Sequence, residues 1–304
     1  MMKQRFRIVG TAAAGVLAMG LLAACGSGDS GSASDSGGGE SKELSVPIAA
    51  GWDEDIAVSH LWKYALEQKG YTVELPQVDI GPAFAGVAKG DFDLFFDTWL
   101  PTTHEDYWNQ YQDQVEDIGV WYDKATLNIA VPEYVDAKTI GDLQGMASTF
   151  DGTITGIDSG AGLTRVTREE AMPTYDLDDY TLRTSSTTAM LSALQKATQA
   201  QEPIVVTLWH PHWAYSAYPI KDLEDPEGAM GGAEEIHVIG RDGFGEEFPE
   251  LNSALQKFTI DDKTLASLEN TVLQEHDDPA AGAEAWAKEN QDFVNQMTQG
   301  ISGS

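Results

Sequence analysis

The sequence predicts an α/β protein of two lobes, and three observations lead to this prediction. Short apolar runs alternate with stretches of helical spacing, which is the pattern of βαβ units. A second series of such runs begins at 154–157, after the first has ended. The folded part of the chain holds about 260 residues, more than a single core usually contains. We therefore expect two α/β units of similar size joined by short crossings.

The first unit has the order β-α-β-α-β, which predicts a largely parallel sheet. Each of its two helices is followed by a glycine, a common helix end. The predicted strands are 46–50, 71–75 and 92–96, and the predicted helices are 55–69 and 84–89.

The second unit repeats this alternation without repeating the sequence. Its predicted strands are 154–157, 181–184 and 204–209, and its predicted helices are 163–171 and 187–200. Two further strands are predicted outside this series, at 126–131 and 236–239. The remainder of the chain is mostly helical. Ligands of such sheets bind outside the carboxyl ends of the strands, so the loops that follow strands are the first place to look for a site.

The N-terminus has the order of a secretory signal peptide. Three basic residues within the first seven positions precede the apolar stretch 8–22, which is shorter than the ~20 residues that a membrane span needs. The stretch ends in Leu22-Ala-Ala-Cys25, which resembles the bacterial lipobox. We expect 1–24 to be a signal peptide and Cys25 to carry lipid. Because Cys25 is the only cysteine, no internal disulfide can form.

Composition separates a tether from the folded chain. Residues 25–43 are rich in glycine and serine, and the first part of this segment has no apolar side chain larger than alanine, so it reads as a flexible linker. We expect 44–130 with 235–304 to form lobe 1 and 131–234 to form lobe 2. The 18 basic and 49 acidic residues give a net charge of −31, which disfavours nucleic acid and anionic lipid as partners.

Three loops place a tryptophan after an apolar strand. They contain Trp52, Trp99 and Trp209. A tryptophan at such a place can fill the core, cover the rim of the sheet or serve as a platform for a ligand. An aromatic platform suits a quaternary ammonium, which has no N–H to donate and is held by cation–π attraction. Asp97, two residues before Trp99, either orients the indole or ends the strand.

A glycine-rich turn at 156–164 lies between a predicted strand and a predicted helix. Its unpaired backbone N–H groups would form an anion site without a charged side chain. The turn also contains a GxGxxR pattern, which alone is weak evidence for a dinucleotide. An aromatic cage together with a backbone anion site fits a trimethylammonium carboxylate.

The stretch from Gly51 to Trp213 resembles the substrate-binding lipoproteins of glycine betaine/proline betaine ABC transporters. The strings that carry the resemblance are Trp52-Asp-Glu-Asp-Ile-Ala, Asp97-Thr-Trp-Leu-Pro-Thr-Thr-His104, Gly156-Ile-Asp-Ser-Gly-Ala-Gly-Leu163 and Trp209-His-Pro-His-Trp213. The resemblance implies a bilobed periplasmic-binding-protein fold of type II, with a hinge and a ligand cleft. It also implies a cage of Trp52, Trp99 and Trp209, and a carboxylate held by the side chain of His104 and the backbone N–H groups of Gly162 and Leu163.

The function expected from these features is that of a monomeric, lipid-anchored, extracytoplasmic binding protein that delivers a betaine to an ABC permease. No cofactor and no catalysis are expected. Two alternatives stay open. One is an exported metal-dependent hydrolase that uses His104, His210 or His212, since His210 and His212 are spaced to form a metal pair on a strand. The other is a sensory receptor with the same cleft.

Overall fold

The computed structural model of this protein describes residues 42–303. The predicted signal peptide 1–24, the lipidated Cys25 and nearly all of the linker 25–43 lie outside these residues. Within the described range, no helix is long and apolar enough to cross a membrane. The fold belongs to one unit, Glu40–Ser304.

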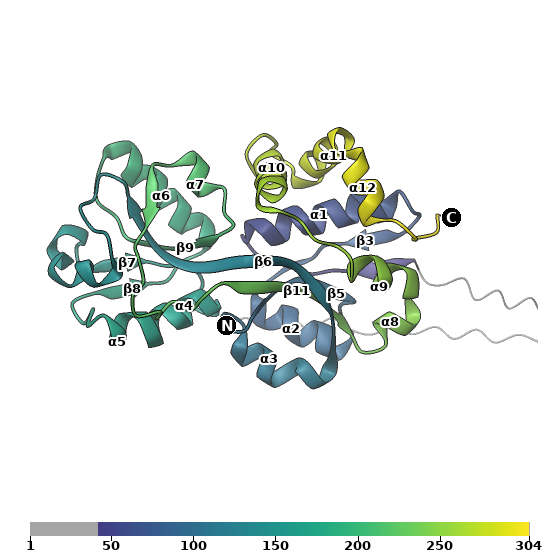
Figure 1. The fold of residues 1–304 in the computed structure, drawn as a ribbon, viewed down its shortest axis with the longest axis horizontal. Coiled ribbons are helices and arrows are strands. Elements are labelled where there is room, and N and C mark those ends of the chain that lie inside the picture. Colours follow the sequence, from purple (N-terminus) through teal and green to yellow (C-terminus); the bar gives the residue numbers. More distant parts are fainter. Residues whose placement is uncertain (1–41, 304) are drawn as a thin grey trace, which may run out of the picture. The chain divides into compact units, whose positions relative to one another are not determined.

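Two α/β lobes make up this unit, and the strand β6 (Val115–Pro132) runs through both (Figure 1). The first lobe contains β1 (Glu43–Ser45), β2 (Ile48–Ala49), α1 (Asp53–Glu67), β3 (Thr72–Glu74), β4 (Gln77–Val78), α2 (Ile80–Lys89), β5 (Leu94–Leu100), α3 (Glu105–Tyr111), β11 (Glu234–Arg241), α8 (Phe244–Glu247), α9 (Pro249–Leu255), α10 (Asp262–Leu273), α11 (Pro279–Glu289) and α12 (Gln291–Met297). The second lobe contains β7 (Thr153–Thr155), α4 (Gly162–Val166), α5 (Met172–Thr174), β8 (Thr181–Arg183), α6 (Thr187–Ala200), β9 (Val206–His210), α7 (Ala214–Ala217) and β10 (Ile220–Asp222). Two lobes of this kind are what the sequence predicts.

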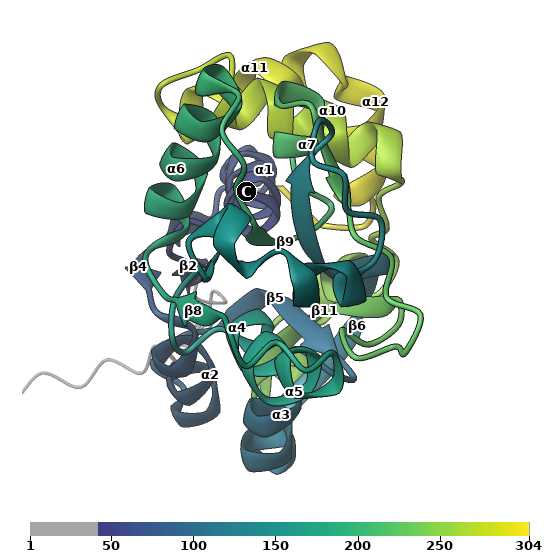
Figure 2. The same cartoon turned by 90° about the vertical axis from the view of Figure 1, so that its left-hand side faces the viewer.

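Each lobe is layered, with helices on both faces of its strands. In the first lobe α1 and α10–α12 lie on one side of the sheet, and α2 and α3 lie on the other (Figure 1). Figure 2 shows the second lobe in front, with α6 and α7 on one side of β9 and α4 and α5 on the opposite side. Both faces of the sheet are therefore covered, which explains why β5 is buried along its whole length.

The strand β6 changes its partner where the chain passes between the lobes. From Val115 to Ala125 it pairs antiparallel with β11, and from Thr126 to Ala130 it pairs antiparallel with β9. The resulting order, β5-β11-β6-β9-β7-β8, is one continuous sheet with β10 also paired to β6. The segment of β6 that crosses from the first lobe to the second is therefore a β-strand and not a loop.

The predicted parallel sheet of the first unit is wrong in part. The strands β1 and β3 pair parallel, as do β2 and β4, but β5 pairs antiparallel with β11. β11 returns from the second lobe and inserts between β5 and β6. Local alternation of strands and helices carries no information about such a late strand, because the pairing joins segments far apart in the sequence.

The helix boundaries differ from the prediction for local reasons. The helix predicted over 55–69 spans Asp53–Glu67, because its acidic first turn belongs to the helix. The helix predicted over 84–89 begins at Ile80, since a proline is tolerated in the first turn. The helix predicted over 163–171 is α4, followed without a break by a π-helical turn and α5.

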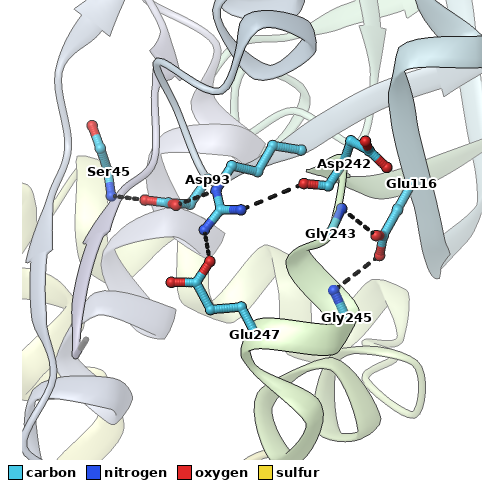
Figure 3. Close-up of polar contacts among 8 residues, drawn as sticks. Ser45, Asp93, Glu116, Asp242, Gly243, Gly245 and Glu247 are labelled. Carbon is cyan, nitrogen blue, oxygen red and sulfur yellow. Dashed lines mark hydrogen bonds and ion pairs between the residues drawn. The ribbon is translucent and has the colours of Figure 1, made fainter. Parts of the chain in front are cut away.

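A network of charged side chains connects the end of β11 to neighbouring elements of the first lobe (Figure 3). The guanidinium of Arg241 donates from Nε to Asp93 Oδ1 at 2.8 Å and contacts Glu247 at 2.5 Å. Asp93 also accepts from the backbone N–H of Ser45 at 2.8 Å. The carboxylate of Glu116 accepts two backbone N–H groups at the start of α8 (Figure 3). Together these contacts join β1, β6, β11 and α8.

Candidate functional site

A cavity between the lobes is lined by all three predicted tryptophans. The side chains of Trp52, Trp99 and Trp209 are 7%, 3% and 3% exposed, so each is nearly enclosed. The lining residues are Trp52, Glu54, Trp99, Thr103, Leu127, Ile157, Ala161, Leu163 and Trp209. Because they come from both lobes, the cavity exists only while the lobes are together.

The elements that carry the tryptophans differ slightly from the prediction. Trp52 lies after β2 and forms the N-cap of α1, as the loop position implies. Trp209 is the penultimate residue of β9, in agreement with the strand predicted over 204–209, whereas Trp99 lies within the end of β5 and not after it. The predicted strand at 92–96 stops too early because Asp97 and Thr98 are polar, yet both are fully buried. The expected placement at the carboxyl ends of strands therefore holds, with the strand extended past the polar pair.

The indole N–H of each strand tryptophan donates to a buried carboxyl group. Trp99 Nε1 donates to Asp97 Oδ1 at 2.6 Å, and Trp209 Nε1 donates to Glu54 Oε2 at 2.9 Å. Asp97 therefore orients the indole of Trp99, which is one of the two roles that its sequence position allows. The second contact crosses from lobe to lobe, because Glu54 belongs to α1 and Trp209 belongs to β9.

These carboxyl groups belong to a buried acidic cluster formed by Asp53, Glu54, Asp55, Asp97 and Glu269. All five are at most 7% exposed. Burial, together with repulsion from Glu269 and Asp53, raises the pKa of Glu54 well above its usual range. Burial and the neighbouring acids likewise raise the pKa of Asp97, and burial raises the pKa of Asp53 to about 7. Negative charge here is unfavourable unless a cation approaches.

His104 is buried beneath Trp52, with the two ring planes 5.5 Å apart between centroids and 5° from parallel. Its Nδ1 accepts the backbone N–H of Trp99 at 2.9 Å. Burial and the charge of Arg165 lower its pKa to about 3, so the ring is neutral and its proton is on Nε2. Among the described residues Nε2 has no partner. His104 thus holds a free donor, although it lies behind the cavity wall rather than in it.

Gly162 and Leu163 form the first turn of α4. Leu163 lines the cavity, and the N–H groups of a first helical turn have no partner within the helix. Gly162 lies against Thr103 in the opposite lobe. The predicted anion turn and the predicted cage are therefore at the same cavity.

Contacts between the lobes flank the cavity. Arg165 Nη2 donates to the backbone oxygen of Thr102 at 2.6 Å, and the hydroxyl of Tyr107 donates to the backbone oxygen of Gly160 at 3.0 Å. On the other side, the indole of Trp213 donates to Asp53. The structure thus has its lobes closed on each other.

The two histidines of the third tryptophan loop are held separately. His210 contacts Asp222 at 2.8 Å and stacks on Tyr215. His212 Nδ1 accepts a backbone N–H at 3.0 Å, and its Nε2 lies 3.2 Å from Asp53 Oδ2. Over residues 42–303 no group of three or more potential ligands is arranged to hold a metal ion. A metal-dependent hydrolase gains no support from this geometry.

Several lining residues were not predicted from the sequence, namely Glu54, Thr103, Leu127, Ile157 and Ala161. The acidic run directly after Trp52 is the one signal that could have indicated Glu54. Such a run at a helix start is ordinarily explained by the helix dipole and solvent exposure. Here α1 packs with this end in the interior, and all three acids are buried.

Comparison with known proteins gives a family and a fold. Residues 46–289 match the OpuAC family, described as the substrate binding domain of ABC-type glycine betaine transport system. The glycine betaine/carnitine transport binding protein GbuC of Listeria monocytogenes is 43% identical over 153 residues. That alignment spans 49% of this chain and 50% of GbuC, so the chain spans half the length of this curated relative.

Solved structures resemble this chain over a larger part of its length than the GbuC alignment covers. The lactococcal OpuAC, closed and complexed with glycine betaine, has a TM-score of 0.79 and 32% identity, covering 84% of this chain and 99% of that one. ProX from Borrelia burgdorferi has a TM-score of 0.79 and 29% identity, covering 84% and 96%. The predicted bilobed fold of type II is confirmed by these likenesses.

Proposed function

This chain belongs to the OpuAC family, the substrate-binding domains of ABC-type glycine betaine transport systems, and on that premise we propose that it captures glycine betaine or a related quaternary-ammonium osmolyte between its lobes. It then delivers this ligand to an ABC permease. The observation that carries the proposal is the convergence of Trp52, Trp99 and Trp209 on one cavity.

The three indoles supply the binding site for the cation. A trimethylammonium group offers no hydrogen-bond donor, and electron-rich ring faces attract it when water is excluded. Each such contact contributes roughly 1–2 kcal/mol once desolvated. Three of them supply about half of the ~8 kcal/mol that micromolar affinity requires. The lactococcal relative was solved with glycine betaine bound, which supports this ligand class.

The carboxylate of the ligand is assigned to the first turn of α4 and to His104. The backbone N–H groups of Gly162 and Leu163 are donors at a helix start, where negative charge is favoured. The Nε2–H of His104 is a buried donor without a partner in the described chain, and a ligand carboxylate would satisfy it. Reaching the ligand requires a shift of Trp52, which covers the histidine ring.

Closure of the lobes is assigned to a hinge motion, with 44–130 and 235–304 as lobe 1 and 131–234 as lobe 2. The change of partner along β6 supports this division, since one strand carries both lobes. A ligand that contacts both lobes favours the closed state by its differential affinity.

The setting is extracytoplasmic, with a lipid anchor at Cys25 and a monomeric chain facing its permease. A sensory receptor would use the same cleft, and a neighbouring permease and ATPase in the genome would favour import.

Calorimetric titration of Glu40–Ser304 with glycine betaine and choline in parallel tests the proposal. Tight betaine binding with weak choline binding supports both the cage and the carboxylate site. Equal binding of choline removes the carboxylate site, and binding of neither overturns the ligand class. Trp99→Phe should weaken betaine binding, whereas the matched control Trp108→Phe, which lies outside the cavity lining, should not.

A further inference from the structure

The two strand tryptophans of the cavity share one feature that a core tryptophan does not require. Each donates its indole N–H to a carboxyl group rather than to a neutral backbone oxygen. The contrast is Trp121, equally buried, whose N–H donates to the backbone oxygen of Phe96 at 2.6 Å. A neutral acceptor therefore suffices to satisfy an indole in this fold, and the carboxyl groups of Asp97 and Glu54 need another explanation.

We propose that Asp97 and Glu54 are positioning residues of the cage, which fix the indoles of Trp99 and Trp209 and make the cavity select a cationic ligand over a neutral one of the same shape. This inference rests on the proposed function. A carboxylate at the N–H edge of an indole polarises the ring and makes its face more electronegative. The face, in turn, is what attracts the ammonium.

The carboxyl groups of Asp97 and Glu54 are buried and have no basic partner, which supports this role. Asp97 and Glu54 are 0% and 1% exposed. Within the described chain, neither forms an ion pair with a lysine or arginine. One oxygen of Asp97, Oδ2, has no hydrogen-bond partner there. A buried carboxylate left in this state is costly, and a cation held in the adjacent cavity would compensate it.

Acidic side chains of α1 and α10 face these two groups. Glu54 faces Asp53 on α1 and Glu269 on α10, and Asp97 faces Glu54 and Asp55. Burial and this repulsion raise the pKa values of both groups. A bound ammonium opposes that shift, so capture of a cation should release protons from the cluster.

The placement of Glu54 adds a link to closure. Its carboxyl group lies on α1 of the first lobe, and it accepts from Trp209 of the second lobe. Glu54 also lines the cavity itself. The indole of Trp209 therefore takes its fixed orientation only when the lobes meet. Asp97 and Trp99, in contrast, belong to one strand, and their contact does not depend on closure.

The test compares glycine betaine with its neutral-headed carbon isostere, 3,3-dimethylbutanoate, which keeps the carboxylate and the three methyl groups. Binding to the full chain is measured by calorimetry at pH 8 for the wild type, Glu54→Gln and Asp97→Asn. Each variant should lose at least about five-fold in betaine affinity and much less in isostere affinity. A merely structural role would weaken both ligands equally, and that result would overturn the proposal.

The matched control is Asp225→Asn, which removes a partly buried carboxyl group that accepts several hydrogen bonds away from the cavity. Its ratio of betaine to isostere affinity should equal that of the wild type. A change of the same size as in Glu54→Gln would overturn the proposal, because the effect would then belong to net charge.

A second measurement uses the wild type alone, so it does not depend on whether a variant folds. Betaine titrations near pH 7 in buffers of different ionisation enthalpy should show net proton release, and isostere titrations should not. Equal proton exchange for the two ligands contradicts the inference. If the wild type bound no betaine at all, the proposed function itself would fail, and that outcome differs from betaine binding without discrimination.

Discussion

The Cα atom of Gly162 packs against the backbone oxygen of Thr103 across the cleft. A Cβ atom at position 162 would lie 1.9 Å from that oxygen, well inside any allowed contact. Thr103 is itself fixed, because its N–H donates to the buried carboxylate of Glu234 at 2.8 Å. Since the backbone on both sides is held, neither can yield, and closure to this state requires a glycine.

The substitution Gly162→Ala should therefore prevent full closure. The alanine keeps the backbone N–H that is assigned to the ligand carboxylate, so a loss of binding reports the steric contact and not a lost donor. We expect the affinity for glycine betaine to fall by at least about ten-fold, since the variant must bind in a more open state. Small-angle scattering should show little compaction when the ligand is added.

Gly160→Ala is the matched control for this variant. Its Cβ would meet only the hydroxyl of Tyr107 at 3.7 Å and Ile80 at 3.9 Å, which are ordinary contacts. Normal affinity and normal compaction are expected. If Gly162→Ala also closed normally, the contact with Thr103 would not limit closure.

The difference between these two glycines shows what the sequence can and cannot reveal. Both belong to the same glycine-rich turn at 156–164. Gly162 is close-packed because Thr103 lies opposite it, and Thr103 comes from a loop far away in the chain. In the same way, helix α6 was predicted at its observed bounds, because its pattern is local, whereas the insertion of β11 between β5 and β6 was not.

The convergence of the three tryptophans on one cavity could be expected from the sequence, because strand ends are local features that share one edge of a sheet. Glu54 and Asp97 were harder, since charged side chains are usually exposed. Their burial depends on how α1 and β5 pack and on which indole each one meets.

Replacement of His104 should weaken binding of the ligand's carboxylate and leave binding of its ammonium group unchanged. His104→Ala removes the Nε2–H donor assigned to the carboxylate. We expect betaine affinity to fall by about ten-fold, as for a lost hydrogen bond to a charged group, and choline affinity to change little. Parallel calorimetry with both ligands measures this. An equal loss for both would instead indicate that His104 acts by supporting the ring of Trp52, on which it stacks.

The protonation of Asp53 should make stability depend on pH. Burial raises its pKa in the folded protein from 3.8 to about 7, so the folded state holds a proton that the unfolded chain releases. The free energy of unfolding is then highest below the unfolded pKa, falls as the pH rises toward about 7, and is flat above it. Asp53→Asn should remove this part of the slope and stabilise the protein at pH 8 by about 1–3 kcal/mol.

Urea unfolding of the wild type and of Asp53→Asn between pH 4 and 8 (a window of about four units around the shift) gives this difference directly. Asp113→Asn, an exposed change, should leave the slope as it is. Parallel pH profiles for the wild type and Asp53→Asn would show that Asp53 is not the responsible group.

The network around Arg241 should affect stability and not binding. Arg241→Ala removes the contacts to Asp93 and Glu247 and leaves both carboxylates without their cation. Because Arg241 and Asp93 are each only 19% exposed, we expect a loss of about 1–3 kcal/mol in the free energy of unfolding. None of these residues lines the cavity, so betaine affinity should stay within about two-fold of the wild type.

The matched control is Lys288→Ala, which breaks an exposed ion pair with Glu284. It should change the free energy of unfolding by less than about 0.5 kcal/mol. Equal effects of the two variants would mean that the network at the end of β11 contributes no more than a surface pair.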